Sequence, residues 1–158
     1  MKFFLLFIFS SMYVSASNSE VKLKSLMELY HKAAKTKEGN AQLASFLASN
    51  RSQLDDQTYK VFSANVHFFN AQYFDNPFKK FSEFKKGKEI LESLISENPQ
   101  QCLFRYFRFA VQINSPAILD YQKNIQEDKR LLIDYLQNCD FSSNYLCKSF
   151  KEIVDSHK

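Results

Sequence analysis

The stretch NPFKKFSEFKKGKEILESLISENPQQCLFRYFRFAVQI, residues 76–113, decides the fold class. The apolar residues of its first half recur at the spacing of one helix face: Phe81, Phe84, Leu91, Leu94 and Ile95. Its second half is apolar on nearly every side, which is typical of an interior helix. Asn76 before Pro77 marks a helix start, because Asn caps free amides and Pro fits the first helical position. The stretch therefore predicts two consecutive helices, Pro77–Glu97 and 102–113.

The rest of the chain has the same helical character. Only two glycines and three prolines occur in 158 residues, so folds that need many tight turns have little material. Asn98-Pro99 and Ser115-Pro116 repeat the pattern of a helix start, and Ser52 with Asp55 resembles a capping box. The sequence predicts an all-α fold.

Apolar periodicity places further helices on both sides of this stretch. They are expected at 19–37, closed by Gly39, at 41–49, after Ser52, at 118–136 and at 145–154. Gly87 lies on the apolar face of its helix, where a missing side chain lets a neighbouring helix approach. About seven helices with short connections predict antiparallel helical hairpins or an irregular bundle.

The first sixteen residues, MKFFLLFIFSSMYVSA, have the pattern of a secretory signal peptide. One positive charge at Lys2 precedes an apolar run, and Val14 and Ala16 occupy the small-residue positions before a cleavage site. We expect residues 1–16 to be removed and 17–158 to form a single helical domain. We further expect an exported protein, periplasmic or secreted, without a transmembrane segment after cleavage.

Three cysteines remain in the chain expected after export. Cys139 and Cys147 flank a turn-like segment, which predicts a disulfide between them in an oxidising compartment. Cys102 is expected to be a buried small hydrophobic residue. The three histidines lie on different helices, and neither they nor the cysteines have the spacing of metal ligands, so we expect no metal and no cofactor.

The formal net charge of +4 is spread along the chain, and we expect no nucleic-acid partner. The densest basic run is interleaved with Phe81 and Phe84 and comprises Lys79, Lys80, Lys85, Lys86 and Lys88. We interpret it as a solvated helix face, because its phenylalanines follow the core period. Contact with anionic lipid or a polyanion is the alternative interpretation.

Arg105 and Arg108 stand three residues apart in an otherwise apolar helix, and charged groups in such surroundings need partners. The structural hypothesis pairs them with acids that follow in the sequence: Asp120, Glu127 and Asp128. The functional hypothesis is an anion-binding pocket, because an arginine fork suits carboxylate or phosphate. Its rim would consist of Tyr121, Lys123 and Asn124.

Two stretches resemble known families. GKEILESLISENP, residues 87–99, resembles the second helix of a tetratricopeptide repeat at Gly87, Leu91, Leu94 and Pro99. That resemblance implies stacked helical hairpins with a concave groove. Residues 76–130, with the phrases NPFKKFSEFKKGKEIL, FRYFRFAVQINSP and ILDYQKNIQEDK, are similar to an uncharacterised family of exported helical proteins from Bacteroidetes. This similarity implies a cell-envelope location and gives no activity.

Three functional hypotheses follow from the sequence. The leading one is a non-enzymatic cell-envelope protein whose helical surface binds another protein or a peptide. A carrier or sensor of a small apolar or anionic ligand, anchored by Arg105 and Arg108, is the second. An exported hydrolase is the third, and no motif identifies its catalytic residues. The sequence leaves the oligomeric state open.

Overall fold

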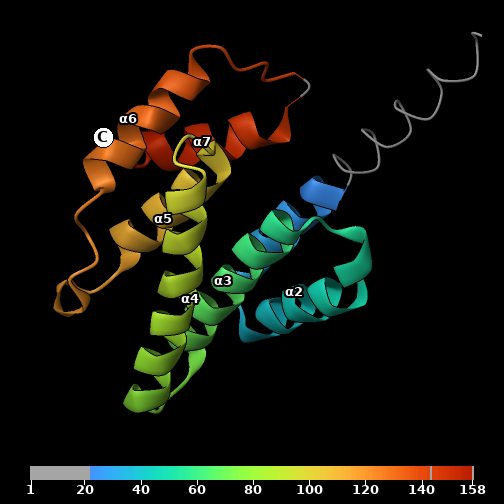
Figure 1. Ribbon diagram of the computed structural model, residues 1–158, viewed down its shortest axis with the longest axis vertical. Coiled ribbons are helices and arrows are strands. Elements are labelled where there is room, and N and C mark those ends of the chain that lie inside the picture. The colour runs from blue at the N-terminus through green and yellow to red at the C-terminus, as the bar shows by residue number, and fades with distance from the viewer. Residues whose placement is uncertain (1–21, 143, 158) are drawn as a thin grey trace, which may run out of the picture.

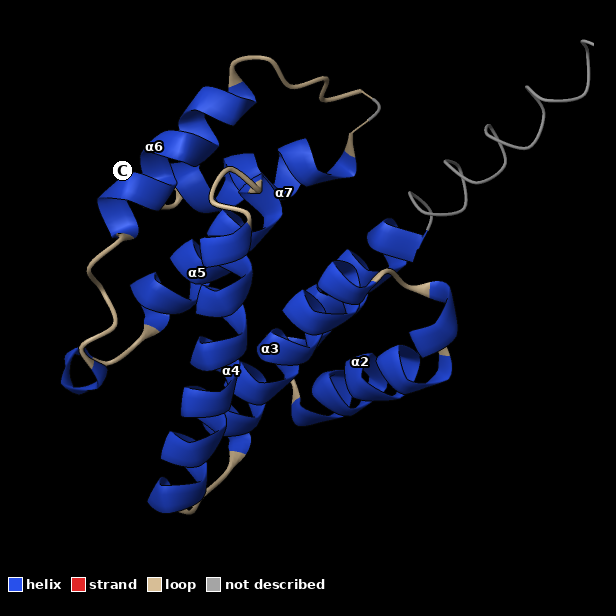
Figure 2. Ribbon diagram, viewed as in Figure 1, coloured by secondary structure: helices blue, strands red, loops and turns tan. Residues whose placement is uncertain are grey.

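The computed structural model describes residues 22–142 and 144–157, and these residues are all-helical, without a strand (Figure 2). A first helix is described over 22–33. Six further α-helices follow: α2 (Lys37–Ser49), α3 (Asp56–Tyr73), α4 (Pro77–Glu97), α5 (Cys102–Asn114), α6 (Ile125–Leu136) and α7 (Tyr145–Asp155). Two short 3₁₀ turns, η1 (Arg51–Gln53) and η2 (Ala117–Leu119), lie in the connections. The predicted all-α class and about seven helices are confirmed.

Neighbouring helices pack against one another, as short connections require. The pairs α2 with α3, α3 with α4, α4 with α5, α5 with α6 and α6 with α7 are all in contact. Figure 1 shows α3 and α4 as a long central hairpin, with α2 beside α3 and the α5–α7 group at the other side. The interior is aromatic: the Phe107 ring lies 4.9 Å from that of Tyr30 and 5.2 Å from that of Phe62. These contacts join the first helix, α3 and α5 into one core.

The predicted helix starts have mixed outcomes. Asn76 caps α4 by accepting hydrogen bonds from two amides, with Pro77 in the first turn, as the sequence indicates. The predicted capping box of Ser52 with Asp55 is not formed. Asp55 caps α3 by itself, and Ser52 lies in η1. Gly39 does not close the first helix, which ends at residue 33. Thr36 instead caps α2 by accepting a hydrogen bond from the Gly39 amide.

The starts predicted at Asn98-Pro99 and Ser115-Pro116 are wrong. Asn98 and Ser115 each end the preceding helix, and α5 begins only after Gln101. A proline just beyond a helix fits this pattern equally well, because it cannot continue the helix. The expected long helix at 118–136 is therefore shorter. It begins at Ile125, and residues 115–124 form an irregular segment that contains η2.

The disulfide between Cys139 and Cys147 is present and joins the end of α6 to α7. Cys102 is a free thiol in the first turn of α5, and it is partly exposed rather than buried as expected. Within the described residues, no helix is long and apolar enough to span a membrane. The expected signal peptide, residues 1–16, lies outside the described residues.

Gly87 has the structural role that the sequence indicates. A Cβ atom on Gly87 would lie 2.8 Å from the Ala64 carbonyl oxygen and 3.1 Å from the Phe68 ring. The backbone of α4 therefore packs directly on α3, which fixes the distance between the two longest helices.

We expect Gly87→Ala to destabilise the protein, although Ala gains about 1 kcal/mol over Gly in a helix interior. The added methyl would push against a backbone oxygen, and overpacking of this kind costs about 1–3 kcal/mol. Urea denaturation should show a net loss, whereas Ser96→Ala on the exposed side of α4 should change little. Increased stability in Gly87→Ala would show that α3 and α4 can separate at little cost.

Candidate functional site

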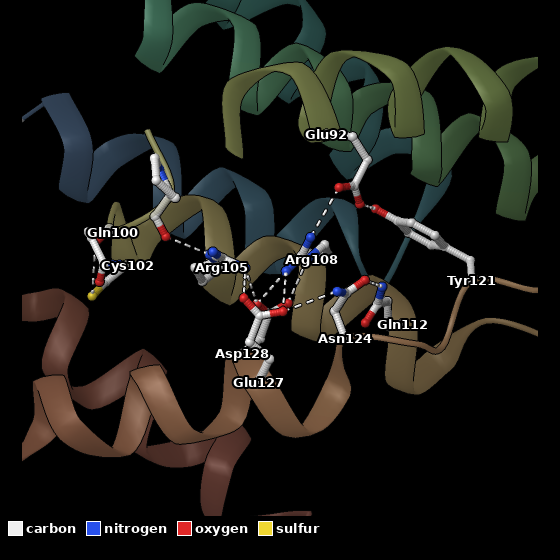
Figure 3. Close-up of polar contacts among 11 residues, drawn as sticks. Glu92, Gln100, Cys102, Arg105, Arg108, Gln112, Tyr121, Asn124, Glu127 and Asp128 are labelled. Atoms are coloured by element: carbon white, nitrogen blue, oxygen red, sulfur yellow. Dashed lines mark hydrogen bonds and ion pairs between the residues drawn. The ribbon is translucent and has the colours of Figure 1, made fainter. Parts of the chain in front are cut away.

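Arg105 and Arg108 lie in a buried cluster of charges between α5 and α6 (Figure 3). The centre of the cluster is Asp128, whose side chain is fully buried. Arg108 binds it through two nitrogens, with Nε to Oδ2 and Nη2 to Oδ1 both at 2.7 Å. Arg105 adds a third hydrogen bond, from Nη1 to Oδ1 at 3.0 Å. The structural hypothesis for the arginines is therefore supported, with Asp128 as their shared partner.

Two other carboxylates complete the cluster. Glu127 lies 2.9 Å from Arg105 Nη1, and Glu92 of α4 accepts a hydrogen bond from Arg108 Nη1 at 3.0 Å. Burial lowers the pKa of Arg108, but the hydrogen bond and charge of Asp128 and those of Glu92 outweigh it and raise the pKa above its usual value. Asp120, the third acid proposed from the sequence, is exposed and pairs with Lys123 instead. Asp120 lies in the irregular segment 115–124, where its backbone is left-handed, with a φ of 45°.

The predicted rim residues have different positions. Tyr121 is buried and donates a hydrogen bond to Glu92 at 2.5 Å, so it supports the cluster. Burial, the hydrogen bond with Glu92 and its charge raise the pKa of Tyr121. Asn124 donates to Glu127 at 3.1 Å, and its own oxygen lies 3.4 Å from the Gln112 amide nitrogen. Lys123 points to solvent.

The cluster leaves little capacity for an external anion. Two guanidinium cations face three carboxylates, Glu92, Glu127 and Asp128, so the sum of formal charges is negative. Arg105 Nε is also occupied, because it donates to the Pro99 carbonyl oxygen at 2.8 Å. An anionic ligand would have to displace a carboxylate that is already held at hydrogen-bond distance. The geometry therefore favours a structural role for both arginines.

A groove lies away from the charge cluster, and sequence reasoning did not identify the residues that line it. It has a volume of about 560 Å³, and α2, α3 and α4 all contribute to its lining. Apolar and small side chains form most of the lining: Ala44, Leu47, Ala48, Ser63, Val66, Ile90, Ser93 and Leu94. Because Ala48 and Ser93 are exposed, the groove is open to solvent. The signals in the sequence were the spacing of Ala44 and Ala48, four residues apart on one short helix, and the tetratricopeptide-like stretch that contains Leu94.

A polar network supports one end of the groove. His67 lines the groove, and its Nδ1 lies 2.7 Å from Oε2 of Glu83 on α4. Asn70 donates to the same oxygen, and Lys86 binds the other oxygen at 2.6 Å. Although burial raises the pKa of Glu83, the hydrogen bonds from His67, Lys86 and Asn70 lower it to about 2. Glu83 is thus held as a carboxylate that orients His67.

Ser63, His67 and Glu83 contain the residue types of a hydrolytic triad, and Ser63 lines the same groove. However, Ser63 lies in the middle of α3, where backbone amides are engaged in the helix. Such a serine has no neighbouring free amides to stabilise an oxyanion. No hydrogen bond joins Ser63 to His67 within the described part of the chain. We therefore assign no catalytic step to these residues.

Comparison with known proteins identifies no relative: no family model, no curated protein and no solved structure matches this chain. The geometry of the groove and of the charge cluster is therefore the basis for assigning a function. The similarity to exported Bacteroidetes proteins stays a prediction.

We expect Arg108→Met to destabilise the protein more than Arg105→Met. Loss of Arg108 removes the bidentate partner of a fully buried carboxylate, and breaking such a pair costs about 3–5 kcal/mol. Arg105→Met leaves that pair intact and should cost about 1–3 kcal/mol. Thermal or urea denaturation measures the difference, with exposed Lys123→Met as a control that should change little. Equal, small losses would contradict a structural role centred on Asp128.

The Glu83 carboxylate should make the stability of the fold depend on pH. Because the folded-state pKa of Glu83, about 2, lies below its ordinary value of 4.5, the carboxylate stabilises the fold above that value. This contribution is lost as the pH falls from 4.5 toward 2. Glu83→Gln should therefore cost up to about 3 kcal/mol at pH 7 and progressively less below pH 4.5.

The control for this experiment is Glu89→Gln, which makes the same charge change at an exposed position of α4. Its difference from the unmodified protein should be small at every pH. A constant deficit in Glu83→Gln down to low pH would show that the ionised state of Glu83 is not what stabilises the contact with His67.

Proposed function

We propose that this chain is a non-enzymatic, exported protein of the cell envelope that binds a segment of another polypeptide. The groove between α2, α3 and α4 supports this proposal, because three helices form a preformed, largely apolar channel that is open to solvent. Figure 1 shows that α3 lies between α2 and α4, so it forms the floor. Grooves of this form receive one face of an amphipathic helix or an extended peptide.

The dimensions of the groove fit a short helical segment. Its floor runs from Tyr59 to His67 of α3, a rise of about 12 Å or two helical turns. Ala44, Ala48 and Ser93 on the two walls carry small side chains, which allow a backbone to approach. Val66 and Ile90, which are partly exposed, offer apolar contact to the bound segment, with the almost fully buried Leu47 and Leu94 beside them.

Charged groups mark the two ends of the groove. Lys60 and Glu97 lie at one end, and His67, oriented by Glu83, lies at the other. Polar groups at the ends of an apolar channel fix the orientation of a ligand more than they add affinity. We therefore propose that the bound segment has an apolar centre flanked by polar residues.

The alternative functions have less support in the geometry. A carrier anchored by Arg105 and Arg108 would need free guanidinium groups, whereas both are held by carboxylates. A hydrolase would need a stabilised oxyanion beside Ser63. A helical hairpin arrangement like that of tetratricopeptide repeats is part of our proposal, because such hairpins present a groove of this kind to peptides.

The proposal can be tested with a photoreactive amino acid in cells that make the protein. Position 93 lies in the groove, and position 96, three residues later on α4, is exposed outside it. We expect illumination to join one discrete polypeptide to the chain from position 93 and none from position 96. Ala48→Trp, which fills the groove, should abolish the product, whereas Ser45→Trp on the exposed side of α2 should not.

Identical products from positions 93 and 96 would show non-specific contact and would contradict the proposal. Absence of any product from position 93, with the protein folded and abundant, would also contradict it. A product that survives Ala48→Trp would place the partner on another surface.

A further inference from the structure

The first half of α4 exposes large apolar side chains that the bundle does not cover. Phe78 is 85% exposed and Phe81 is 60% exposed. The expectation that Phe81 belongs to the core is therefore wrong, and only Phe84 of the early phenylalanines is buried. This outcome removes the reason for interpreting the lysine run as an ordinary solvated face, because Phe81, although it has the core spacing, is not covered by the bundle.

The exposed phenylalanines form one face with part of the lysine run. Phe78, Phe81, Lys85 and Lys88 follow one another at spacings of three, four and three residues, so they lie along one side of α4. Near the middle of α4, this side meets the irregular segment 115–124 at Lys88. Lys88 Nζ lies 4.8 Å from the centre of the Tyr121 ring, which also contacts the ring of Phe84 at 5.6 Å.

That segment adds a third apolar side chain to the surface. Ile118 in η2 is 91% exposed, and it is only three residues from Tyr121, which is fixed against α4. Three residues of chain reach at most about 10 Å. Figure 1 shows the 115–124 segment on the side of α4 away from α2, reaching about the level of the middle of α4. Exposed apolar side chains from two parts of the chain thus lie on one side of α4. Lys79 and Lys80 point away from that side, but they flank Phe78 and Phe81 at the start of α4, where residues 77–82 are all exposed. We call this region the Phe–Lys surface (Phe78, Phe81, Ile118 and the lysines 79, 80, 85 and 88).

The charge around this surface is positive. Lys79 and Lys80 are exposed, and neither is paired with an acid within 22–142 and 144–157. Of the nearby acids, Glu83 is turned toward His67 and Lys86, and Glu89 lies 3.7 Å from Lys85. Asp120 is occupied by Lys123. Asp75 precedes the helix, and the five lysines of 79–88 exceed these acids in number.

We propose that the Phe–Lys surface docks on an anionic lipid bilayer, with Phe78, Phe81 and Ile118 entering the headgroup region and the lysines binding lipid phosphates. Aromatic and aliphatic side chains surrounded by lysines are the composition of interfacial membrane sites. A soluble polyanion would satisfy the lysines but gives no reason for three exposed apolar side chains. The lipid surface uses both features, and each lysine near such a surface adds attraction that salt weakens.

The absence of tryptophan from the sequence permits a direct test. Phe78→Trp places a single fluorophore on the surface, and Phe141→Trp places one at a 39% exposed position in the connection from α6 to α7. Both full-length variants are mixed with vesicles of phosphatidylcholine, with or without phosphatidylglycerol. We expect the Phe78→Trp emission to shift to shorter wavelength and to be quenched by brominated acyl chains only when phosphatidylglycerol is present. Phe141→Trp should not respond.

The contribution of the lysines is measured in the same background. Lys79→Gln with Lys80→Gln should weaken the response of Phe78→Trp about tenfold in lipid concentration, and added salt should weaken it further. An unchanged Phe78→Trp emission would overturn the proposal, as would equal quenching at positions 78 and 141. An emission shift with soluble heparin that equals the shift with vesicles would assign the surface to polyanions instead. Each readout is local to α4 and independent of the groove.

Discussion

The arrangement of the second half of the chain depends on the ion pairs that Arg105 and Arg108 make with the fully buried carboxylate of Asp128. A buried carboxylate is tolerated only when its oxygens are hydrogen-bonded and its charge is balanced. Arg108 and Arg105 provide three hydrogen bonds to it from α5. Because all three hydrogen bonds converge on one carboxylate of α6, they hold α6 in one position along α5.

The same cluster extends beyond these two helices. Glu92 connects Arg108 to α4 and, through Tyr121, to the 115–124 segment. The irregular segment therefore has a fixed path although it has little regular structure. Ion pairs of this kind add less stability than apolar residues of equal volume, but they penalise any packing that leaves a charge unpaired. We infer that the cluster contributes mainly to the uniqueness of the fold.

Sequence reasoning predicted the fold class because periodicity and a scarcity of glycine and proline are sufficient for it. It also predicted the Cys139–Cys147 disulfide and the close approach at Gly87, which depend on local spacing. It failed at Asn98-Pro99 and Ser115-Pro116, because a polar residue before proline can end a helix as well as begin one. Glu92 and the groove were missed for another reason: both depend on which helices become neighbours, and one sequence does not show this.

The position of α4 relates the two proposed surfaces to each other. Successive residues of a helix are rotated by about 100°, so Ser93 and Glu97, which line the groove, lie on a side of α4 roughly opposite to Phe81 and Lys88. The buried side, which contains Gly87 and Leu91, lies between them and faces α3. Docking through the Phe–Lys surface would therefore leave the groove turned away from the bilayer. One helix can in this way hold the protein at a membrane and keep a peptide site accessible from solution.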